Sequence, residues 1–328
     1  SGYTGGELIR LILQHPALEI DFVYSSTRAG KLITSVHQDV LGRTDLTFTT
    51  SINTEVDVLY LCLGHGKSKD FLKLNSFSKK TIIVDLGNDF RLEEDCVFQD
   101  KSFIYGLPEL QKEQIKKASA IANPGCFATG IQLAILPLAK FKKYSESIHI
   151  NATTGSTGAG AELSPTTHFS WRNNNLSWYK PFTHQHLGEV HRSLGQLGAT
   201  SELFFIPQRG AYSRGIFTTA YTTFKGTLSE SVSMYKEFYN DAPFTHISDE
   251  QINLKSVVNT NNCFIHLHLH ENKYRWSINL LAIKEAMNDL RSFPIQEKIE
   301  AANNIKITSF TTKSALKNND MSVNSSLI

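Results

Sequence analysis

The chain has 328 residues, of which 41% are hydrophobic and 20% charged, the balance of a soluble globular protein long enough for two domains. Its formal net charge of +2 and its dispersed basic residues argue against nucleic-acid or membrane-surface partners, so small-molecule partners are expected. The cysteines lie far apart with no CxxC pair, and no apolar run of about eighteen residues or signal peptide is found, so a reducing, cytoplasmic setting is expected.

The chain opens with a glycine-rich turn that runs into a helical pattern ending near Pro16. A phosphate group fits the N-terminus of such a helix, because the first backbone N–H groups there have no partner within the helix. In a dinucleotide-binding fingerprint a strand precedes this turn, and the sequence is expected to begin after that strand. The predicted cofactor contacts here are Gly2, Thr4 and Gly5.

Four strand-like runs follow, at residues 18–24, 56–63, 81–86 and 118–122, with helical or loop segments between them. Strands that alternate with crossovers predict a parallel sheet. Ligands of such a sheet bind beyond the carboxyl ends of its strands, so the loops after these runs are candidate binding loops.

The segment after the first strand-like run indicates which dinucleotide is bound. About 20 residues after the glycine turn, a ribose-recognising residue is expected. Ser25, Ser26 and Arg28 stand there without a carboxylate. Hydroxyls and an arginine suit a 2′-phosphate, which favours NADP(H) over NAD. The alternative is a solvated polar turn.

Cys126 is the strongest catalytic candidate. It follows a Pro-Gly turn and precedes the apolar run 131–138, which predicts a helix beginning at the cysteine. Backbone N–H groups and the helix dipole at such a position favour a thiolate, the nucleophilic form. Asn123, in the same turn, is expected to contact the substrate. The alternative is an inert, buried cysteine at a strand-to-helix turn.

The second half of the chain has strand-like runs at 148–153, 201–206, 216–224 and 257–270, separated by polar loops. This pattern of strand-like runs and polar loops predicts a second, α+β domain with a mixed sheet. The tail 308–328 is rich in Ser, Thr, Asn and Lys and is expected to be poorly ordered.

Two further segments offer anion or cofactor contacts. A Gly-rich turn follows the run 148–153, and Ser156 and Gly158 within it are predicted to approach the cofactor, unless the segment is only a flexible turn. Arg209 and Arg214 interrupt two strands and are candidates for clamping a phosphate or carboxylate. Surface arginines are the alternative.

Two histidines precede an acid at an expected helix start. A general base must be neutral near pH 7 and oriented by a partner, so His184 or His186 is the candidate base and Glu189 the orienting acid. Zinc would require a third ligand that this segment lacks.

A second histidine run, His266, His268 and His270, shares one face of an expected strand. The solvent face of an edge strand explains it as well as a metal site does, and no metal site is predicted.

Seven motifs stand in the order found in the N-acetyl-γ-glutamyl-phosphate reductase family: GYTGGEL, DLGNDFRL, YGLPEL, NPGCFATG, the GSTGAG loop, HQHLGEV and RGIF. The chain resembles this family over roughly residues 1 to 270. The combined order is specific, although each motif alone is not. Cys126 matches the nucleophile of the family, and the segment 184–189 matches its catalytic histidine region.

The resemblance implies an α/β fold, with a Rossmann-type doubly wound parallel sheet and a second α+β domain like those of aspartate-semialdehyde and glyceraldehyde-phosphate dehydrogenases. Residues 1–125 would form the dinucleotide-binding domain, with its first strand missing and part of 280–328 completing it. Residues 126–279 would form the catalytic and dimerisation domain of a homodimer or homotetramer. The usual C-terminal helix is not found after Trp276.

The implied activity is NADPH-dependent reduction of an acyl phosphate, N-acetyl-γ-glutamyl phosphate, to the semialdehyde in arginine biosynthesis. Phosphate would leave as a thioester forms on Cys126. A cysteine acyl-transferase or hydrolase without hydride transfer, and a non-catalytic relative, are the competing hypotheses.

Overall fold

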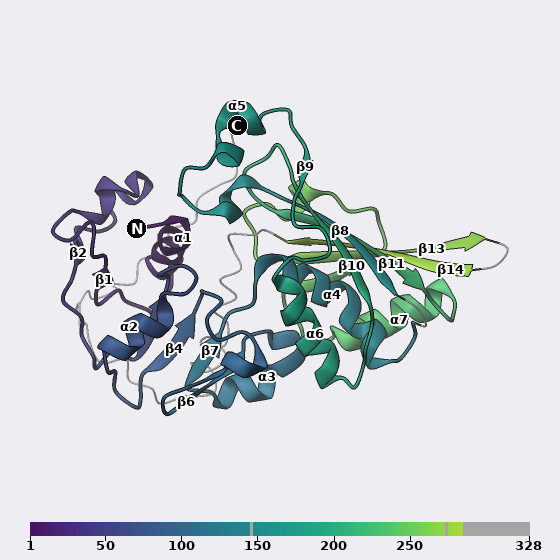
Figure 1. Ribbon diagram of the computed structural model, residues 1–328, viewed down its shortest axis with the longest axis horizontal. Coiled ribbons are helices and arrows are strands. Elements are labelled where there is room, and N and C mark those ends of the chain that lie inside the picture. Colours follow the sequence, from purple (N-terminus) through teal and green to yellow (C-terminus); the bar gives the residue numbers. More distant parts are fainter. Residues whose placement is uncertain (145–146, 273–274, 285–328) are drawn as a thin grey trace, which may run out of the picture.

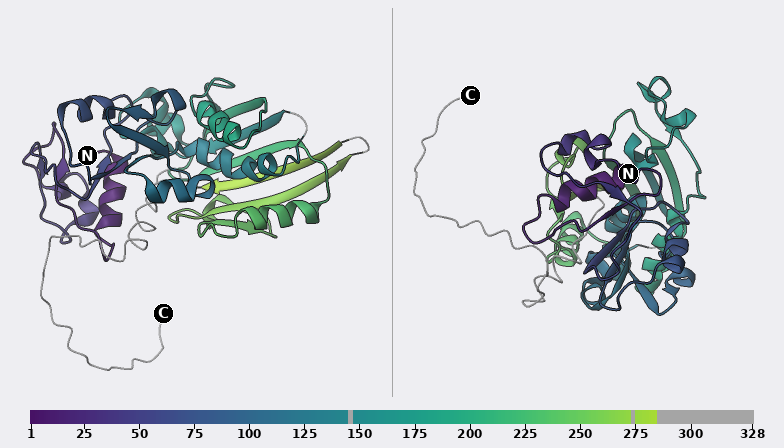
Figure 2. Two further views of the ribbon diagram at one scale, coloured as in Figure 1. Left: turned by 90° about the horizontal axis from the view of Figure 1, so that it is seen from below. Right: turned by 90° about the vertical axis from the view of Figure 1, so that its left-hand side faces the viewer.

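The computed structural model describes residues 1–144, 147–272 and 275–284, with side chains described up to residue 270. The chain forms two domains side by side, the N-terminal one around a parallel sheet and the second around a larger mixed sheet (Figure 1). The view from below separates the same two parts (Figure 2). The predicted class, a parallel α/β domain followed by an α+β domain with a mixed sheet, is confirmed.

The main sheet of the first domain has the order β3-β4-β7-β6-β5. Four of its strands pair in parallel, and β5 joins the edge antiparallel to β6. The central strands are short apolar runs, as expected where both faces of a sheet are covered. The strand bounds are β3 (Val58–Leu61), β4 (Ile82–Asp85), β5 (Val97–Phe98), β6 (Lys101–Tyr105) and β7 (Ala120–Ala122).

A separate two-stranded parallel sheet pairs β1 (Val23–Tyr24) with β2 (Phe48–Thr49). The sequence predicted a longer strand over 18–24 in the same sheet as 56–63. Among the described residues that prediction is wrong, because β1 pairs only with β2. The helices of this domain are α1 (Tyr3–Ile12), α2 (Ser68–Leu74) and α3 (Pro108–Lys117).

The second domain is built on a seven-stranded sheet of order β12-β13-β14-β11-β8-β10-β9. Its strands are β8 (Ile148–Thr154), β9 (Ser177–Trp178), β10 (Leu203–Arg209), β11 (Ile216–Thr223), β12 (Thr245–Ser248), β13 (Cys263–Asn272) and β14 (Arg275–Lys284). Parallel pairs, β8 with β10 and β12 with β13, alternate with antiparallel ones, which makes the sheet mixed.

Helices cover one face of this sheet (Figure 1). They are α4 (Cys126–Lys140), α6 (His186–Gln196) and α7 (Leu228–Phe238), while the short α5 (Phe169–Arg172) lies in a loop outside this layer. Helix α4 is buried along most of its length, because its apolar residues continue around the whole helix. Residues of β8 alternate between buried and half-buried, so one face lies in the core and the other stays open.

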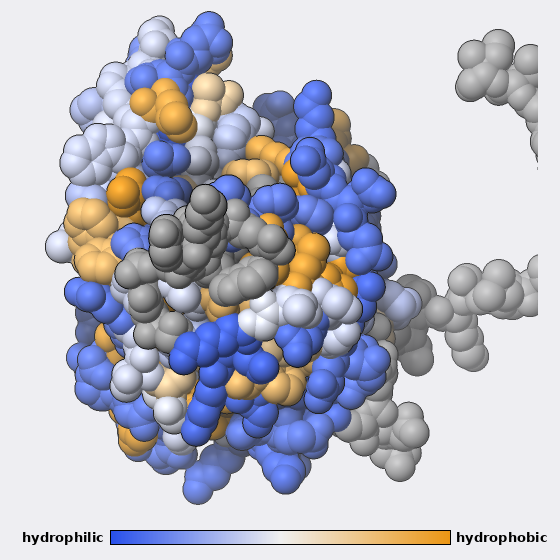
Figure 3. Space-filling view, turned by 90° about the vertical axis from the view of Figure 1, so that its right-hand side faces the viewer, coloured by the Kyte–Doolittle hydropathy of each residue, from blue (hydrophilic) through white to orange (hydrophobic). Residues whose placement is uncertain are grey.

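Short 3-10 helices occupy several loops: Ile33–Ser35, Gln38–Val40, Glu93–Asp95, Ser156–Ala159, Pro165–Thr167 and Leu254–Ser256. The third of these lies between β4 and β5, and the last lies before β13. Seen from the end where β13 and β14 project, hydrophobic residues form small separate patches among hydrophilic ones (Figure 3).

Some strands of the structure differ from those predicted. The run 257–270 contains a strand only from Cys263 onward, since a 3-10 helix and turns occupy the residues before it. Strands β2, β5, β6, β9, β12 and β14 were not predicted from the sequence. The expected poor order of 308–328, and the completion of the first domain by residues after 284, lie outside the described residues.

Candidate active site

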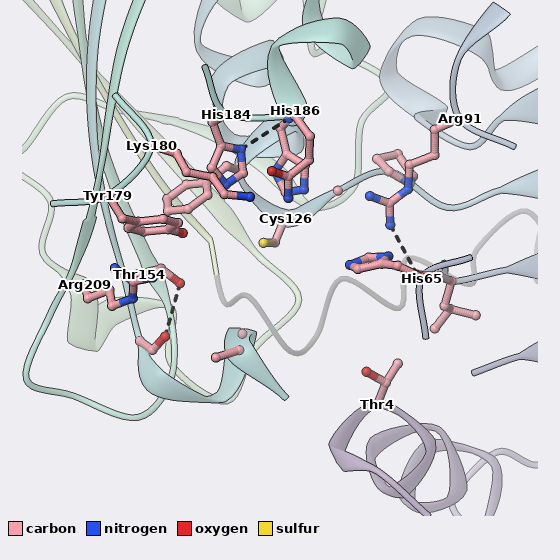
Figure 4. A pocket seen from close by; sticks show the side chains of 18 of the residues that line it. Thr4, His65, Arg91, Cys126, Thr154, Tyr179, Lys180, His184, His186 and Arg209 are labelled. Atoms are coloured by element: carbon pink, nitrogen blue, oxygen red, sulfur yellow. Dashed lines mark hydrogen bonds between the residues drawn. The ribbon is translucent and has the colours of Figure 1, made fainter. Parts of the chain in front are cut away.

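A pocket of about 340 Å³ lies where the two domains meet. Thr4 of α1 and Leu86 after β4 line it from the first domain, and Cys126, Thr154 and Arg209 line it from the second. In Figure 4, Cys126 lies below the imidazoles of His184 and His186, with Tyr179 and Arg209 on one side and Arg91 and His65 on the other. Most of the side chains that the sequence proposed for catalysis therefore share one cavity.

Cys126 is the first residue of α4, which confirms the predicted helix. Its N-cap residue, Gly125, has extended backbone angles and follows the carboxyl end of β7 by three residues. The first backbone N–H groups of the helix are left unsatisfied by helical geometry, and the helix dipole places partial positive charge beside the thiol. Cys126 is half-buried and lines the pocket.

The two histidines are both buried, and burial lowers the pKa of each to about 3. Both imidazoles are therefore neutral at pH 7, as a proton acceptor must be. His186 begins α6, which confirms the predicted helix start, and Glu189 lies in the first turn of the same helix. His184 precedes the helix by two residues.

Packing and one hydrogen bond fix the histidine pair. The backbone N–H of His186 donates to Nδ1 of His184 at 3.3 Å, so in neutral His184 the proton resides on Nε2. The Phe127 ring lies edge-on to both imidazoles, with centroids 5.4 Å from His184 and 6.2 Å from His186. The Nδ1 atom of His186 is buried without a hydrogen-bond partner among the described residues.

Glu189 is a buried acceptor of three hydrogen bonds. Its Oε2 accepts from the hydroxyl of Tyr105 and the backbone N–H of Gly125, both at 2.8 Å, and its Oε1 accepts from Arg91 at 3.2 Å. His186 Nε2 lies 3.9 Å from Oε1, beyond hydrogen-bond range. The carboxylate thus positions the turn before Cys126 directly, and contacts the predicted imidazole only as a neighbouring charge.

Gly125 must lack a side chain for this arrangement to form. A Cβ atom there would stand 2.5 Å from His186 Nε2 and 2.7 Å from Glu189 Oε1. Such distances are shorter than atoms in contact allow, so the imidazole and the carboxylate are packed directly on the backbone that presents Cys126.

The two predicted arginine clamps occupy different places. Arg209 lines the pocket, with its guanidinium 3.7 Å from the ring centroid of Tyr179, a cation–π contact. Arg214 does not line the pocket, and it forms an ion pair at 2.5 Å with Glu7 of α1. Asn123 is buried and lines the pocket, and its amide donates to the Pro124 carbonyl.

The predicted cofactor contacts divide into two groups. Thr4 and Gly158 line the pocket, while Ser156 stands beside it with its backbone N–H bonded to the Tyr212 carbonyl. Gly2, Gly5, Ser25, Ser26 and Arg28 do not line it. They lie at the N-terminus of α1 and beyond the end of β1.

Further pocket side chains that were not identified from the sequence include His65, Arg91, Arg172, Tyr179 and Lys180. A sequence signal for Arg91 was available, because it lies shortly after the predicted strand 81–86, where ligands of a parallel sheet bind. Its side chain is 5% exposed, and a buried guanidinium requires a charged partner, which here is Glu189. The Lys180 side chain, also a cation, lies beside His184 (Figure 4).

Among residues 1–144, 147–272 and 275–284, no cluster of three or more His, Cys, Asp or Glu side chains is arranged to hold a metal ion. Within the same residues, helices are too short or too polar to cross a bilayer.

Two family models cover most of the chain. The NAD binding domain of semialdehyde dehydrogenases matches residues 1–118, and their dimerisation domain matches residues 126–280. The N-acetyl-gamma-glutamyl-phosphate reductase of Flavobacterium johnsoniae is 57% identical over 269 residues, which are 81% of this chain and 83% of the relative. The reductase of Christiangramia forsetii is 55% identical over 275 residues, 83% of this chain and 84% of the relative.

Solved structures share the fold at low identity. Aspartate semialdehyde dehydrogenase II from Vibrio cholerae has a TM-score of 0.68 at 12% identity, covering 93% of this chain and 97% of that one. The Candida albicans enzyme solved with NADP has a TM-score of 0.63 at 15% identity, covering 92% and 96%. By its sequence relatives and its two matched domains, the chain belongs to the N-acetyl-gamma-glutamyl-phosphate reductase family of semialdehyde dehydrogenases.

Proposed function

We propose that this chain reduces N-acetyl-γ-glutamyl phosphate to N-acetylglutamate 5-semialdehyde with NADPH, releasing phosphate, as a step of arginine biosynthesis. The observation that carries the proposal is Cys126 at the start of α4, in one pocket with the neutral imidazoles of His184 and His186 and three arginines. The names of the curated relatives support the same reaction.

Cys126 supplies the nucleophile. His186 accepts the thiol proton, because Nδ1 of neutral His184 already accepts the His186 backbone N–H and its Nε2 carries a proton. The sulfur forms a bond to the acyl carbon as the bond from that carbon to the phosphate oxygen breaks. Phosphate leaves with its electron pair, and a thioester remains on Cys126. Its carbonyl is electrophilic enough to accept hydride, which a carboxylate is not.

Negative charge develops on the acyl oxygen twice in this reaction, once as the thioester forms and once as it is reduced. The start of α4 stabilises that charge. The first backbone N–H groups of the helix have no partner within it and would stabilise this charge without reorganisation. When the tetrahedral intermediate collapses, the carbon–sulfur bond breaks, the aldehyde leaves and the thiolate is restored.

Residues at the carboxyl ends of the strands fit a phosphorylated dinucleotide. A Cβ at Gly2 would meet nothing within 4 Å, so the N-terminus of α1 is open to a pyrophosphate. Gly2, Thr4 and Gly5 would hold that group. Arg28, with Ser25 and Ser26, would hold the 2′-phosphate, and Ser156 and Gly158 would approach the nicotinamide half. When bound, NADPH supplies the hydride.

Cations on opposite sides of the pocket suit the two anionic ends of the substrate. Arg91, held by Glu189, stands on the cofactor-domain side and would bind the leaving phosphate. Arg209, held over Tyr179, would bind the α-carboxylate, with Asn123 near the reacting carbon. Arg214 was the other candidate for this role, and its pairing with Glu7 favours Arg209.

The open face of the second domain's sheet is the surface that we propose for assembly into a homodimer or homotetramer. On it, His149 stacks between Phe204 and Tyr221 at centroid distances of 4.9 and 5.0 Å. Tyr221 is 40% exposed, which is high for an aromatic residue on a central strand. Tyr221→Asp should therefore shift the sedimentation coefficient toward the monomer, and an unchanged coefficient would contradict this interface.

The test of the reaction is NADP reduction by the aldehyde in the presence and absence of inorganic phosphate. We expect phosphate-dependent reduction with N-acetylglutamate semialdehyde, and a parallel assay with the N-succinyl analogue reports the acyl preference. Cys126→Ser should abolish the activity, whereas Cys96→Ser, whose thiol lies outside the pocket, should retain it. Full activity of Cys126→Ser would remove the mechanism.

The same assay separates the competing hypotheses. An acyl-transferase or hydrolase would cleave the acyl phosphate without any change in NADPH absorbance. A non-catalytic relative would do neither. The glycine-rich start of α1 and the Ser25 to Arg28 segment favour the reductase, because a hydrolase has no use for them.

A further inference from the structure

Arg172, the last residue of the short helix α5, places a second guanidinium on the wall of the active-site pocket that holds Arg209. Arg172 is buried, with 7% of its surface exposed. Its guanidinium donates to two backbone carbonyls, from Nε to Gly210 at 3.0 Å and from Nη2 to Thr154 at 2.9 Å. These bonds hold the guanidinium at the carboxyl ends of β8 and β10.

The two carbonyls use only part of the donor capacity of Arg172. A guanidinium has five N–H donors in one plane, and the bonds to Gly210 and Thr154 use two of them. Because Arg172 also lines the pocket, the remaining donors can serve a ligand that binds there. The two bonds fix the guanidinium in advance, so little side-chain freedom would be lost when such a ligand binds.

The charges around Arg172 make an anion the expected ligand. Burial, and after it the nearby charge of Arg209, lowers the pKa of Arg172 from its usual value, so the two guanidiniums repel each other. Arg209 is held over the ring of Tyr179, which has no charge to oppose this repulsion. Among the described residues, no Asp or Glu side chain lines the pocket. An anion bound between the two cations would remove the repulsion.

The alternative is that Arg172 only connects the ends of β8 and β10. These strands already pair in parallel along their whole length. Beyond them, the backbone N–H of Gly210 donates to the Thr154 carbonyl at 2.9 Å, so the two residues that Arg172 contacts are joined without it. A neutral side chain could strengthen that connection without placing a second cation beside Arg209. The charge of Arg172 therefore favours a ligand-binding role.

We propose that Arg172 and Arg209 bind one carboxylate between them, and that it is the α-carboxylate of the substrate. The identity of this carboxylate rests on the proposed function, whereas the binding of a carboxylate between the two guanidiniums does not. Arg172 is then a specificity-determining residue, which selects N-acyl amino acid semialdehydes over aldehydes without a carboxylate. The phosphate group would lie toward Arg91, on the opposite side of Cys126 (Figure 4).

Two ligands that differ only in the α-carboxylate test the site without turnover. They are N-acetylglutamate and 4-acetamidobutanoate, each titrated into the full chain by isothermal calorimetry. We expect the parent to bind N-acetylglutamate at least about tenfold more tightly, because only this ligand reaches both guanidiniums with a carboxylate. Arg172→Met should weaken N-acetylglutamate about tenfold and leave the affinity for 4-acetamidobutanoate within about twofold. Equal affinity of the parent for the two ligands would overturn the proposal.

Further variants localise the effect. Arg43→Met removes an exposed cation outside the pocket and should leave both affinities unchanged. If circular dichroism shows Arg172→Met to be unfolded, Arg172→Gln replaces it with the same expected result, since its amide can still donate to one carbonyl. Adding Arg209→Met should cost less affinity than the sum of the single losses, because both guanidiniums act on one carboxylate. Equal weakening of both ligands, or additive losses, would overturn the shared site.

The link to the reaction is measured separately. Phosphate-dependent NADP reduction is followed with N-acetylglutamate semialdehyde and with 4-acetamidobutanal, which lacks the α-carboxylate. Arg172→Met should lower kcat/KM about tenfold for the first aldehyde only, whereas a merely structural role would lower it for both and would contradict the proposal. Selective binding of N-acetylglutamate without turnover of either aldehyde would leave the carboxylate site intact and count against the proposed function.

Discussion

Glu189 holds the backbone of Gly125, with Oε2 accepting its N–H at 2.8 Å, one residue before Cys126. The same oxygen accepts from Tyr105, and Oε1 accepts from Arg91. One buried carboxylate in α6 therefore positions the turn that presents the sulfur and an arginine that faces the pocket.

Glu189→Gln should destabilise the fold and lower turnover together. An amide cannot accept all three hydrogen bonds, and Arg91 would stay buried without its counter-charge, a loss of about 3 to 5 kcal/mol in the free energy of unfolding. Urea titration measures it. Glu93→Gln, which removes an exposed carboxylate 3.7 Å from Arg192, should leave the unfolding midpoint unchanged. Equal midpoints for both variants would contradict the role of Glu189.

Gly125→Ala should reduce kcat/KM about a hundredfold, because its Cβ would displace His186 or Glu189 from the turn that holds Cys126. Steady-state kinetics provide the measurement. Gly195→Ala is the matched control, since this exposed glycine of α6 has open space around it. That change should keep the activity and raise stability by about 0.4 to 1 kcal/mol. Comparable activity losses in both variants would refute the close-packing argument.

The buried histidines should make the protein acid-sensitive. The folded pKa of His186 is lowered to about 3, so below its ordinary value of 6.5 the unfolded chain binds a proton that the native state excludes. The free energy of unfolding should fall as pH drops from about 6.5 toward 3, by up to about 1.4 kcal/mol per pH unit for this group. Burial lowers the pKa of His184 to about 3 as well, so His184 adds a slope of the same sign.

Urea titrations between pH 7.5 and 4.5 test this dependence. His186→Gln should flatten the curve, while His191→Gln, on the exposed side of the same helix, should keep the slope of the parent. If the two variants follow the same curve, the acid sensitivity arises elsewhere.

Asp85 should affect the pH dependence of the free energy of unfolding in the direction opposite to that of the histidines. Burial raises its pKa to about 6, against the hydrogen bonds from Ser68 and Gly87 that favour its charged form. The native state binds this proton more tightly than the unfolded chain, so the stability it contributes is present below about pH 4 and is lost as pH rises to 6. The total is on the order of 3 kcal/mol.

Asp85→Asn keeps the oxygen that accepts both hydrogen bonds and removes the buried charge. It should therefore be more stable than the parent at pH 8, and nearly equal to it at pH 4. Asp100→Asn, at an exposed turn, is the control. A variant less stable than the parent at pH 8 would show that the charge of Asp85 is needed.

The parts of the site that could be predicted from sequence are those set by local pattern. The Pro-Gly turn and the apolar run fixed the start of α4 at Cys126, and the position of Glu189 three residues after His186 matched the start of α6. Both are short-range signals, because capping and periodicity act within a few residues.

The network around Glu189 could not be predicted in this way. Arg91, Tyr105 and Gly125 lie 98, 84 and 64 residues from it along the chain, so only the folded sheet brings them together. For the same reason Arg209 and Arg214 looked alike in sequence, although one stacks on Tyr179 and the other pairs with Glu7. Strand β6 was missed because its side chains alternate over only five residues.

The ion pair between Arg214 and Glu7 connects the second domain to helix α1 of the first domain. The loop that carries Arg214 bonds to the turn at the pocket wall, through Thr157 N–H to the Ser213 carbonyl and Gly155 N–H to the Gly215 carbonyl. The first helix and that wall are therefore connected by this chain of contacts. An anion that binds at the N-terminus of α1 would therefore also shift the opposite wall of the active-site pocket. Binding of the dinucleotide and the shape of the substrate site would be coupled in this way.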